Sequence, residues 1–189
     1  MRGRRPLRGQ AARAMTKAIG ASIHASAVLV GKRAVLIRGP SGSGKSRLAL
    51  DLILAGRAGQ IAPAVLVGDD RVHVAAKQGV LTVQPAPALA GLIEIRGLGI
   101  RRCEFAEEAI VGLVVDLDAA DAERLPAAEA LSVRVDGILT PRLPVARGFD
   151  GLKLVIAALT MSANSSSPQP SVDCRKGIGN HINPTIATE

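Results

Sequence analysis

The residues with the clearest chemistry form a glycine-rich loop with the sequence GPSGSGKS at positions 39–46. The loop follows the G-x4-G-K-[S/T] pattern of a phosphate-binding loop. Glycines let the backbone curl so that successive N–H groups point at phosphate oxygens, and the N-terminus of a following helix adds to this attraction. We predict that the loop binds a nucleotide, with Lys45 at the β- and γ-phosphates and the Ser46 hydroxyl on Mg²⁺. The loop residues are Gly39, Pro40, Ser41, Gly42, Ser43, Gly44, Lys45 and Ser46.

Acidic residues that could serve a phosphoryl transfer occur at two further places. Asp69 and Asp70 follow the apolar run 64–67 after one glycine, and Glu94 lies within the apolar sequence Leu-Ile-Glu-Ile. Charged residues rarely lie in apolar strands unless they are paired or bind a metal, so Glu94 is a candidate metal ligand. An ion pair with Arg96 is the alternative. Consecutive strand residues point to opposite faces, so we expect Asp69 and Asp70 to divide their roles rather than share a proton.

The elements around the loop follow the order strand, loop, helix, strand. The apolar run 34–37 predicts a buried strand that ends at the loop, and the leucine spacing after the loop predicts a helix with Gly56 as its C-cap. The run 64–67 predicts the next strand. This βαβ order places the loop at the carboxyl end of its strand. We expect Asp69 at the end of the strand beside it, where its carboxylate can face Ser46 and the γ-phosphate.

The remaining elements complete one α/β domain. We predict strands at 23–30, 92–95, 110–117 and 131–135, a hairpin over 71–83 that turns at Gln78-Gly79, and a short closing helix at 151–161. The expected fold class is therefore α/β, a P-loop nucleotide-binding domain with a mixed sheet and flanking helices.

The distribution of charge divides the chain into three parts. The chain has 189 residues and a formal net charge of +8, and six of its basic residues but no acidic one lie before Ile19. We predict a disordered basic leader at 1–20, a catalytic domain at 21–161 and a disordered Ser/Pro-rich tail at 162–189. Alternatively, the leader contacts an anionic partner or directs the chain to mitochondria.

The composition argues against several classes of function. With 48% apolar residues, the chain can form a core without disulfides or metal. Phe105 and Phe149 are its only aromatic residues, which argues against nucleic-acid binding by base stacking. No apolar run of about 18 residues could span a membrane, and no secretory signal is visible. We expect a cytoplasmic protein in which Cys103 and Cys174 are reduced thiols.

Five segments, in this order, resemble the catalytic domain of bacterial HPr kinase/phosphorylase. They are IHASAVLV (23–30), VLIRGPSGSGKSRLALDLI (35–53), LVGDDRV (66–72), EIRGLGI (94–100) and RLPVARG (142–148). The resemblance covers about residues 22–160 and implies a fold like that catalytic domain, with ATP and Mg²⁺ as cofactors. It implies phosphorylation of a serine of HPr, the phosphocarrier of the sugar phosphotransferase system, and the reverse phosphorolysis. It also implies a possible homohexamer and a short form without the large N-terminal domain of full-length members.

The resemblance assigns proton transfer to two residues. Asp69 matches the catalytic aspartate, which accepts the proton of the serine hydroxyl and returns it in the reverse direction. His24 matches a histidine that steadies this carboxylate, although Ala25 replaces the glycine usual in the family. Lys45 is the catalytic lysine of the phosphate loop.

The resemblance assigns metal and phosphate contacts to further residues. Glu94 matches a Mg²⁺ ligand beside Ser46, and Asp70 is expected to support the metal or to anchor its loop. Arg124 matches a catalytic arginine that stabilises charge on the transferring phosphoryl group, although the preceding segment is several residues shorter. Other arginines could take this role, namely Arg101, Arg102 and Arg134.

The largest departure from the family lies in the predicted phosphorolysis loop, which here contains Pro144 and Arg147. The family carries an extra residue and two basic positions in this loop. Arg147 could still bind inorganic phosphate, but a positive charge and a proline have been lost. This departure favours the kinase direction over the phosphorylase direction.

Two other classes of function are compatible with the phosphate loop. A small-molecule kinase or a P-loop ATPase would use the same loop, although the only candidate for a mobile lid, 96–102, is short. A non-catalytic nucleotide sensor is the second alternative, and the combination of His24, Asp69 and Glu94 argues against it. The expected partner is HPr, without nucleic acid or membrane.

Overall fold

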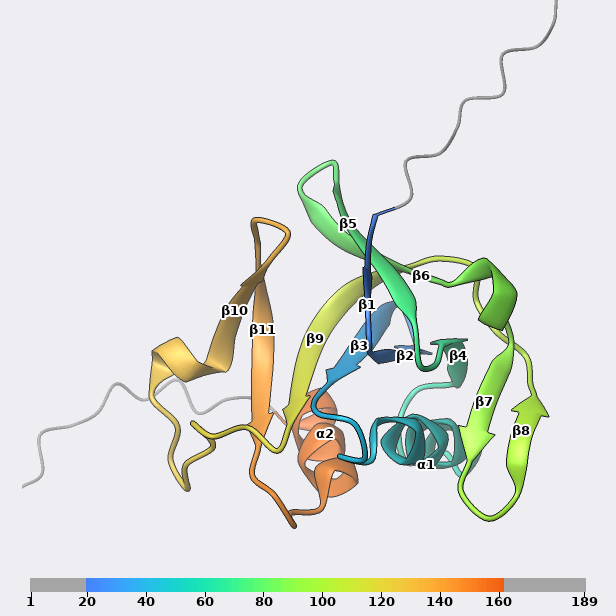
Figure 1. The fold of residues 1–189 in the computed structure, drawn as a ribbon. Coiled ribbons are helices and arrows are strands. Elements are labelled where there is room, and N and C mark those ends of the chain that lie inside the picture. Colours follow the sequence, from blue (N-terminus) through green and yellow to red (C-terminus); the bar gives the residue numbers. More distant parts are fainter. Residues whose placement is uncertain (1–19, 162–189) are drawn as a thin grey trace, which may run out of the picture.

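A curled, mixed β-sheet forms the body of the protein in the computed structural model, which describes residues 20–161 (Figure 1). The strands are β1 (Ala21–Ile23), β2 (Ser26–Val30), β3 (Arg33–Arg38), β4 (Ala64–Gly68), β5 (Val72–Lys77), β6 (Val80–Pro85), β7 (Leu92–Ile95), β8 (Gly99–Arg102), β9 (Ala109–Leu117), β10 (Ser132–Val135) and β11 (Ile138–Val145). The helices are α1 (Lys45–Arg57) and α2 (Gly151–Thr160), with short 3-10 helices η1 (Pro87–Leu89) and η2 (Ala128–Leu131). Within the described residues, nine strands form the main sheet in the order β1-β5-β6-β9-β3-β2-β4, β11 pairs with β9 and β10, and β7 and β8 form a separate hairpin.

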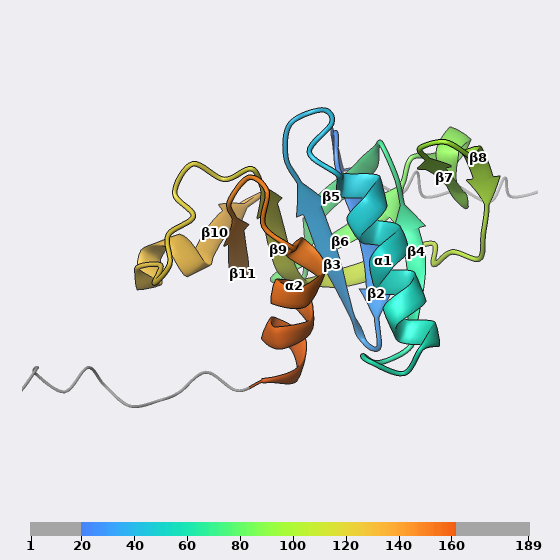
Figure 2. The same cartoon turned by 90° about the horizontal axis from the view of Figure 1, so that it is seen from below.

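The two faces of the sheet are covered in different ways. Both α-helices lie on one face, where Leu52 of α1 and Val155 of α2 pack with Ile37 of β3 in one buried cluster (Figure 2). The other face is covered by the sheet itself, because β5 and β6 curl over it and bury a second cluster around Leu36 and Val74. The α/β class with a mixed sheet is confirmed, with both α-helices on one face.

The strand beside the phosphate loop is not the one that the sequence predicted. Strand β2 pairs antiparallel with both β3 and β4, so it separates the strand that feeds the loop from the strand that precedes Asp69. The expectation that Asp69 follows the adjacent strand is therefore wrong. Because β2 runs in the opposite direction, its first residue, Ser26, lies at the edge where β3 and β4 end. A break at His24–Ala25 divides the predicted strand 23–30 into β1 and β2.

Strand β11 was missed as a strand because it contains Pro141 and Pro144. Prolines are confined to positions where a strand lacks a hydrogen-bonded neighbour on one side. Residues 138–141 of β11 pair only with β10, and residues 142–145 pair only with β9, so each proline sits in a half that has one neighbour.

The other predicted elements are confirmed with small shifts of their ends. The hairpin turns at Gln78 and Gly79, which both adopt positive φ angles as such a turn requires. Helix α1 ends at Arg57, and its C-cap is Ala58 rather than the predicted Gly56. Instead, a Cβ at Gly56 would lie 2.7 Å from the backbone nitrogen of Ala64, so this glycine allows the helix to approach β4.

Some expectations concern residues outside the described range. The predicted tail at 162–189 and the predicted leader at 1–20, apart from Gly20, lie outside it. Among residues 20–161, no helix is long and apolar enough to cross a membrane.

Candidate active site

The phosphate loop joins β3 to α1 with the backbone conformation that its glycines allow. Gly42 and Gly44 have φ angles of 81° and 96°, in the left-handed region that favours glycine. A Cβ at either position would meet no atom within 4 Å, so space is open there. No side chain caps the first turn of α1, whose N–H groups can therefore bind an anion. In the described part of the chain, Ser43 Oγ is a buried polar atom without a hydrogen-bond partner. These features fit the phosphate groups of a nucleotide.

Lys45 is held inside this loop by backbone oxygens. Its Nζ donates hydrogen bonds to the carbonyls of Gly39, at 3.0 Å, and Pro40, at 2.9 Å, and the residue is 6% exposed. Burial lowers the pKa of the Lys45 ammonium, although the negative charges of Asp69 and Asp70 act in the opposite direction. The charges of both carboxylates therefore act on the loop lysine, although Asp70 was expected to point away from Asp69.

The carboxylate of Asp69 is buried and held at both oxygens. Ser26 Oγ donates a hydrogen bond to Oδ1 at 2.5 Å, and the backbone N–H of Glu94 donates to Oδ2 at 3.2 Å. Asp69 is 3% exposed, and Ser26 is fully buried. Hydrogen bonds to a charged acceptor are stronger than neutral ones, so these contacts fix the direction of the carboxylate. Ser26 was not among the predicted site residues, and its only signal in the sequence is a hydroxyl in an otherwise apolar strand.

His24 contacts Asp70 rather than Asp69. Its Nε2 lies 3.3 Å from Asp70 Oδ1, and both side chains are exposed, at 46% and 66%. Strand β4 ends at Gly68, and Asp70 adopts a left-handed φ of 66°, so strand alternation does not set the direction of its side chain. His24 was expected to steady the carboxylate of Asp69, but the side chain that binds this carboxylate is Ser26.

The apolar neighbours of Glu94 in the sequence suggested a buried side chain, but Glu94 is exposed. It lies on β7 of the separate β7–β8 hairpin, and its side chain is exposed. Within residues 20–161 it makes no ion pair with Arg96, and no group of three or more metal-ligating side chains is preassembled. Mg²⁺ in kinases is usually held by one or two carboxylates together with substrate phosphates, so a site of this kind does not need a preassembled group of protein ligands.

The other predicted site residues follow two further strands of the sheet. Arg124 is exposed in the segment between β9 and η2, and Arg147 is exposed just after β11. Pro144 is buried in β11 opposite Asp116 of β9. Strands β3, β9 and β11 are parallel and end at one edge of the sheet. The phosphate loop and the segments that carry Arg124 and Arg147 therefore leave the same edge.

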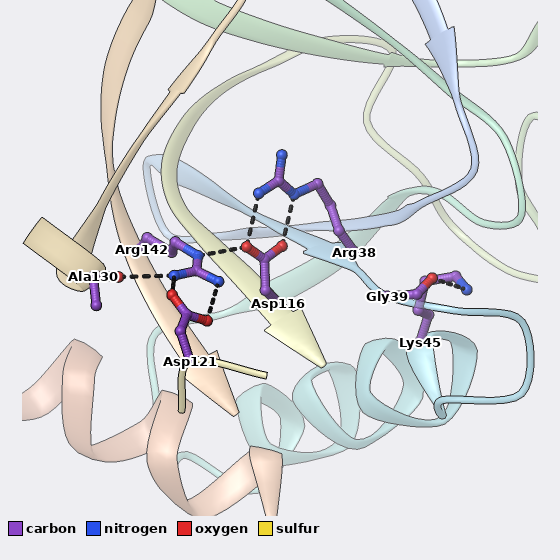
Figure 3. A network of polar contacts seen from close by, with 7 residues as sticks. All are labelled: Arg38, Gly39, Lys45, Asp116, Asp121, Ala130 and Arg142. Carbon is purple, nitrogen blue, oxygen red and sulfur yellow. Dashed lines mark hydrogen bonds and ion pairs between the residues drawn. The ribbon is translucent and has the colours of Figure 1, made fainter. Parts of the chain in front are cut away.

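A network of arginines and aspartates joins these three strand ends (Figure 3). Arg38, the last residue of β3, and Arg142 of β11 both bind the carboxylate of Asp116 on β9. Arg142 also binds Asp121 and the carbonyl of Ala130. None of these residues was singled out by the sequence analysis.

Comparison with known proteins identifies the family. The family model of the HPr Serine kinase C-terminal domain matches residues 16–163. This chain belongs to that family. An HPr kinase/phosphorylase of Enterococcus faecalis is 36% identical over 164 residues, which cover 78% of this chain and 50% of that protein. One from Neisseria meningitidis is 35% identical over 141 residues, covering 66% of this chain and 42% of that protein.

A solved structure of the same family supports the fold. The HPr(Ser) kinase/phosphatase of Coxiella burnetii matches with a TM-score of 0.59 and 26% identity, covering 74% of this chain and 93% of that one. The chain spans half or less of the length of the curated HPr kinase/phosphorylases cited above. The fold of an HPr kinase catalytic domain, expected from the sequence, is confirmed.

Proposed function

We propose that this chain is an enzyme that transfers the γ-phosphoryl group of ATP to a serine hydroxyl of HPr. The observation that carries the proposal is the buried Asp69 carboxylate, fixed by Ser26 and near the phosphate-loop lysine Lys45. Family membership and relatives named HPr kinase/phosphorylase support HPr as the acceptor.

In the proposed reaction, the phosphate loop binds and orients the nucleotide. Backbone N–H groups of the loop and of the first turn of α1 bind the phosphates, and Lys45 exchanges its carbonyl partners for phosphate oxygens. The oxygen of the serine hydroxyl attacks the γ-phosphorus, and the bond between the γ-phosphorus and the oxygen of ADP breaks. Asp69 accepts the proton of the serine hydroxyl during this step. Positioned proton transfer of this kind accelerates reactions by about 10²- to 10⁴-fold.

The remaining site residues have supporting roles in the proposal. Mg²⁺, when bound, neutralises charge on the phosphates, and Ser46 with Glu94 or Asp70 would hold it. Arg124 stabilises charge on the transferring group, and His24 acts through Asp70 at the rim of the site. Arg147 lies in the proposed phosphorolysis loop, whereas Pro144 belongs to strand β11 that leads into it. Because this loop lacks a basic position and a proline that the family carries, the kinase direction is the proposed main activity.

The proposal is tested by incubating the full chain with HPr, Mg²⁺ and ATP labelled in its γ-phosphate. We expect label on a serine of HPr, and none on HPr whose acceptor serine is replaced by alanine. Lys45→Ala should abolish transfer, and Asp69→Asn should lower it by at least about 100-fold while ATP affinity is kept. Asp51→Asn, which removes a carboxylate from the surface pair with Arg47, is the matched control and should leave transfer unchanged.

The same assay separates the alternatives. Label on a small metabolite would indicate a small-molecule kinase, phosphate release alone would indicate an ATPase, and ATP binding without either would indicate a nucleotide sensor. Pyrophosphate release from phosphoseryl-HPr after addition of inorganic phosphate would establish the reverse reaction.

We also propose that the chain acts in the cytoplasm, where ATP is available.

We further propose that the chain forms oligomers, with a homohexamer as the expected form. Helix α2 supports assembly because its sequence, GLKLVIAALT, is almost entirely apolar, yet only Val155 is buried. Leu159 at 40% and Met161 at 71% exposure extend this apolar face to the end of the described chain. Sedimentation that shows only monomers at micromolar concentration would contradict the assembly.

A further inference from the structure

The carboxylate of Asp116 is the centre of the network at the edge of the sheet where the site lies. Arg38 donates to both of its oxygens, from Nε to Oδ1 and from Nη2 to Oδ2, each at 2.7 Å (Figure 3). Arg142 Nε donates to Oδ2 at 2.5 Å. The Asp116 and Arg142 side chains are only 16% and 13% exposed, so solvent screens the contacts weakly.

One end of the network lies at the base of the phosphate loop. Arg38 directly precedes Gly39 and is opposite Asp116 in the parallel pairing of β3 with β9. The start of the loop also packs on β9, since a Cβ at Gly39 would lie 2.9 Å from the carbonyl oxygen of Leu117. The pair between Arg38 and Asp116 therefore fixes where the loop leaves the sheet.

The other end of the network holds the segment that carries Arg124. Arg142 donates from Nη1 and Nη2 to the two oxygens of Asp121, at 2.6 and 2.9 Å, and from Nη1 to the carbonyl of Ala130 at 3.1 Å. These two partners lie on either side of Arg124 in the sequence. Arg142 thus binds the segment on both sides of its exposed middle, where Leu125 is 84% exposed.

The two ends face one hollow in the surface. A cavity of about 630 Å³ is lined by Arg38 and Asp116 from the first end and by Asp121 and Glu123 from the second. Glu123 directly precedes Arg124 and Arg38 directly precedes the phosphate loop, so the cavity lies between the residues that lead into the Arg124 segment and into the loop.

We propose that Arg38, Asp116, Arg142 and Asp121 form a positioning network that holds the Arg124 segment in register with the phosphate loop. The network rests on the proposed function only for its effect on phosphoryl transfer. Its members are positioning residues, because they act through Arg124 and the loop rather than on the reacting atoms.

The anchoring itself is tested by trypsin cleavage after Arg124, which does not depend on activity. Asp121→Ala removes one anchor and should increase the rate of cleavage after Arg124 by about 10-fold or more. Cleavage after Arg96, in the exposed turn of the β7–β8 hairpin, should not change and serves as the internal control. Glu129→Ala is the matched variant, since it removes a carboxylate that lines the same cavity without a side-chain bond to Arg142 in the described structure.

The effect on catalysis is tested by separating kcat from ATP affinity. Asp121→Ala should lower kcat for HPr phosphorylation by about 10- to 100-fold with unchanged ATP Kd, because a displacement of about 1 Å can cost about 100-fold. In an Arg124→Ala background the same change should have no further effect on kcat. Arg38→Gln removes the other end and should instead raise the ATP Kd several-fold without faster cleavage after Arg124.

The outcomes distinguish this proposal from the proposed function. If the wild-type chain binds ATP but phosphorylates nothing, the kinase proposal fails, whereas faster cleavage in Asp121→Ala would still support the network. Unchanged cleavage would overturn the network whatever the activity. A full loss of kcat in Asp121→Ala that persists in the Arg124→Ala background would show a general structural effect and overturn the positioning role.

Discussion

At the scale of single residues, the carboxylate of Asp69 depends on a hydroxyl that comes from a different strand. A buried carboxylate is costly unless its oxygens receive hydrogen bonds. Ser26 supplies one because β2 runs antiparallel between β3 and β4 and begins where they end. The bond therefore fixes the direction in which the carboxylate of Asp69 points.

We predict that Ser26→Ala lowers kcat by about 10-fold while ATP affinity stays within twofold. In the proposed reaction the Asp69 carboxylate, which loses its hydrogen bond in this variant, acts only on the acceptor. The loss of a bond to a buried charge should also reduce the free energy of unfolding by about 2 kcal/mol. Turnover with HPr and titration with a fluorescent ATP analogue measure the two effects separately.

Thr82→Val is the matched control for Ser26→Ala. Thr82 is also buried, and its hydroxyl donates to the carbonyl of Ala75 at 3.1 Å, in the β5–β6 hairpin. The control should lose about 1 kcal/mol of stability with full turnover. Equal turnover of the Ser26 and Thr82 variants would mean that the serine only stabilises the fold.

The same residues show what the sequence could and could not predict at this scale. The phosphate loop was predictable because its spacing is dictated by local backbone geometry. The partners of Asp69 were not, because they depend on which strand lies between β3 and β4. The rule that charges in apolar strands are paired was applied to Glu94, which is exposed, but it holds for Asp116, which binds two arginines.

At the scale of elements, the contact between α1 and β4 decides how the loop's helix sits on the sheet. Gly56 lies inside α1, where alanine would normally be favoured by about 1 kcal/mol. Here an added Cβ would lie 2.7 Å from the Ala64 nitrogen and 2.8 Å from the Ala64 Cβ. Because the backbone of Ala64 is held in strand β4, relieving this overlap would require helix α1 itself to shift.

We predict that Gly56→Ala destabilises the protein by about 1–3 kcal/mol, against the helix propensity, because overpacking outweighs it. Gly151→Ala at the start of α2 is the control, since its Cβ would meet Leu48 and Leu117 only at ordinary distances of 3.4 and 3.5 Å. That change should be neutral or stabilising by up to about 1 kcal/mol. Urea unfolding of both variants measures the difference, and a stabilised Gly56→Ala would refute the close approach.

Elements with a strong local signal were predicted well, and those defined by pairing were not. The hairpin at Gln78 and Gly79 and the closing helix were predicted because each is formed by residues that are close together in the sequence. Strand β11 was missed since its two prolines are tolerated only through the way that β9 and β10 divide its length. The position of β2 between β3 and β4 is likewise a property of the assembled sheet.

At the scale of the whole molecule, one ion network joins the ends of three parallel strands, and its charge state links the fold to pH. Burial alone would raise the pKa of the Asp116 carboxyl, but hydrogen bonds and charges from Arg38 and Arg142 together lower it below its usual value. The hydrogen bond from Arg142 also lowers the pKa of Asp121.

A lowered pKa in the folded state means that Asp116 stabilises the fold above its unfolded pKa of about 3.9, and that this stabilisation is lost as pH falls through the folded value. We predict that Asp116→Asn lowers the free energy of unfolding by about 2 kcal/mol at pH 7, where Arg38 and Arg142 are left without their shared carboxylate. The difference from wild type should stay constant down to about pH 4 and then shrink as the wild-type carboxyl is protonated. Urea unfolding at intervals from pH 7 to pH 2.5 measures this difference.

The control is Lys77→Gln, which removes an ion pair with Glu108 at the opposite end of β9. In this background, the pH dependence of the difference that Asp116→Asn makes should be unchanged. A gap between wild type and Asp116→Asn that stayed equally large at pH 2.5 would show that shape, rather than the charge of this carboxylate, holds the three strand ends together.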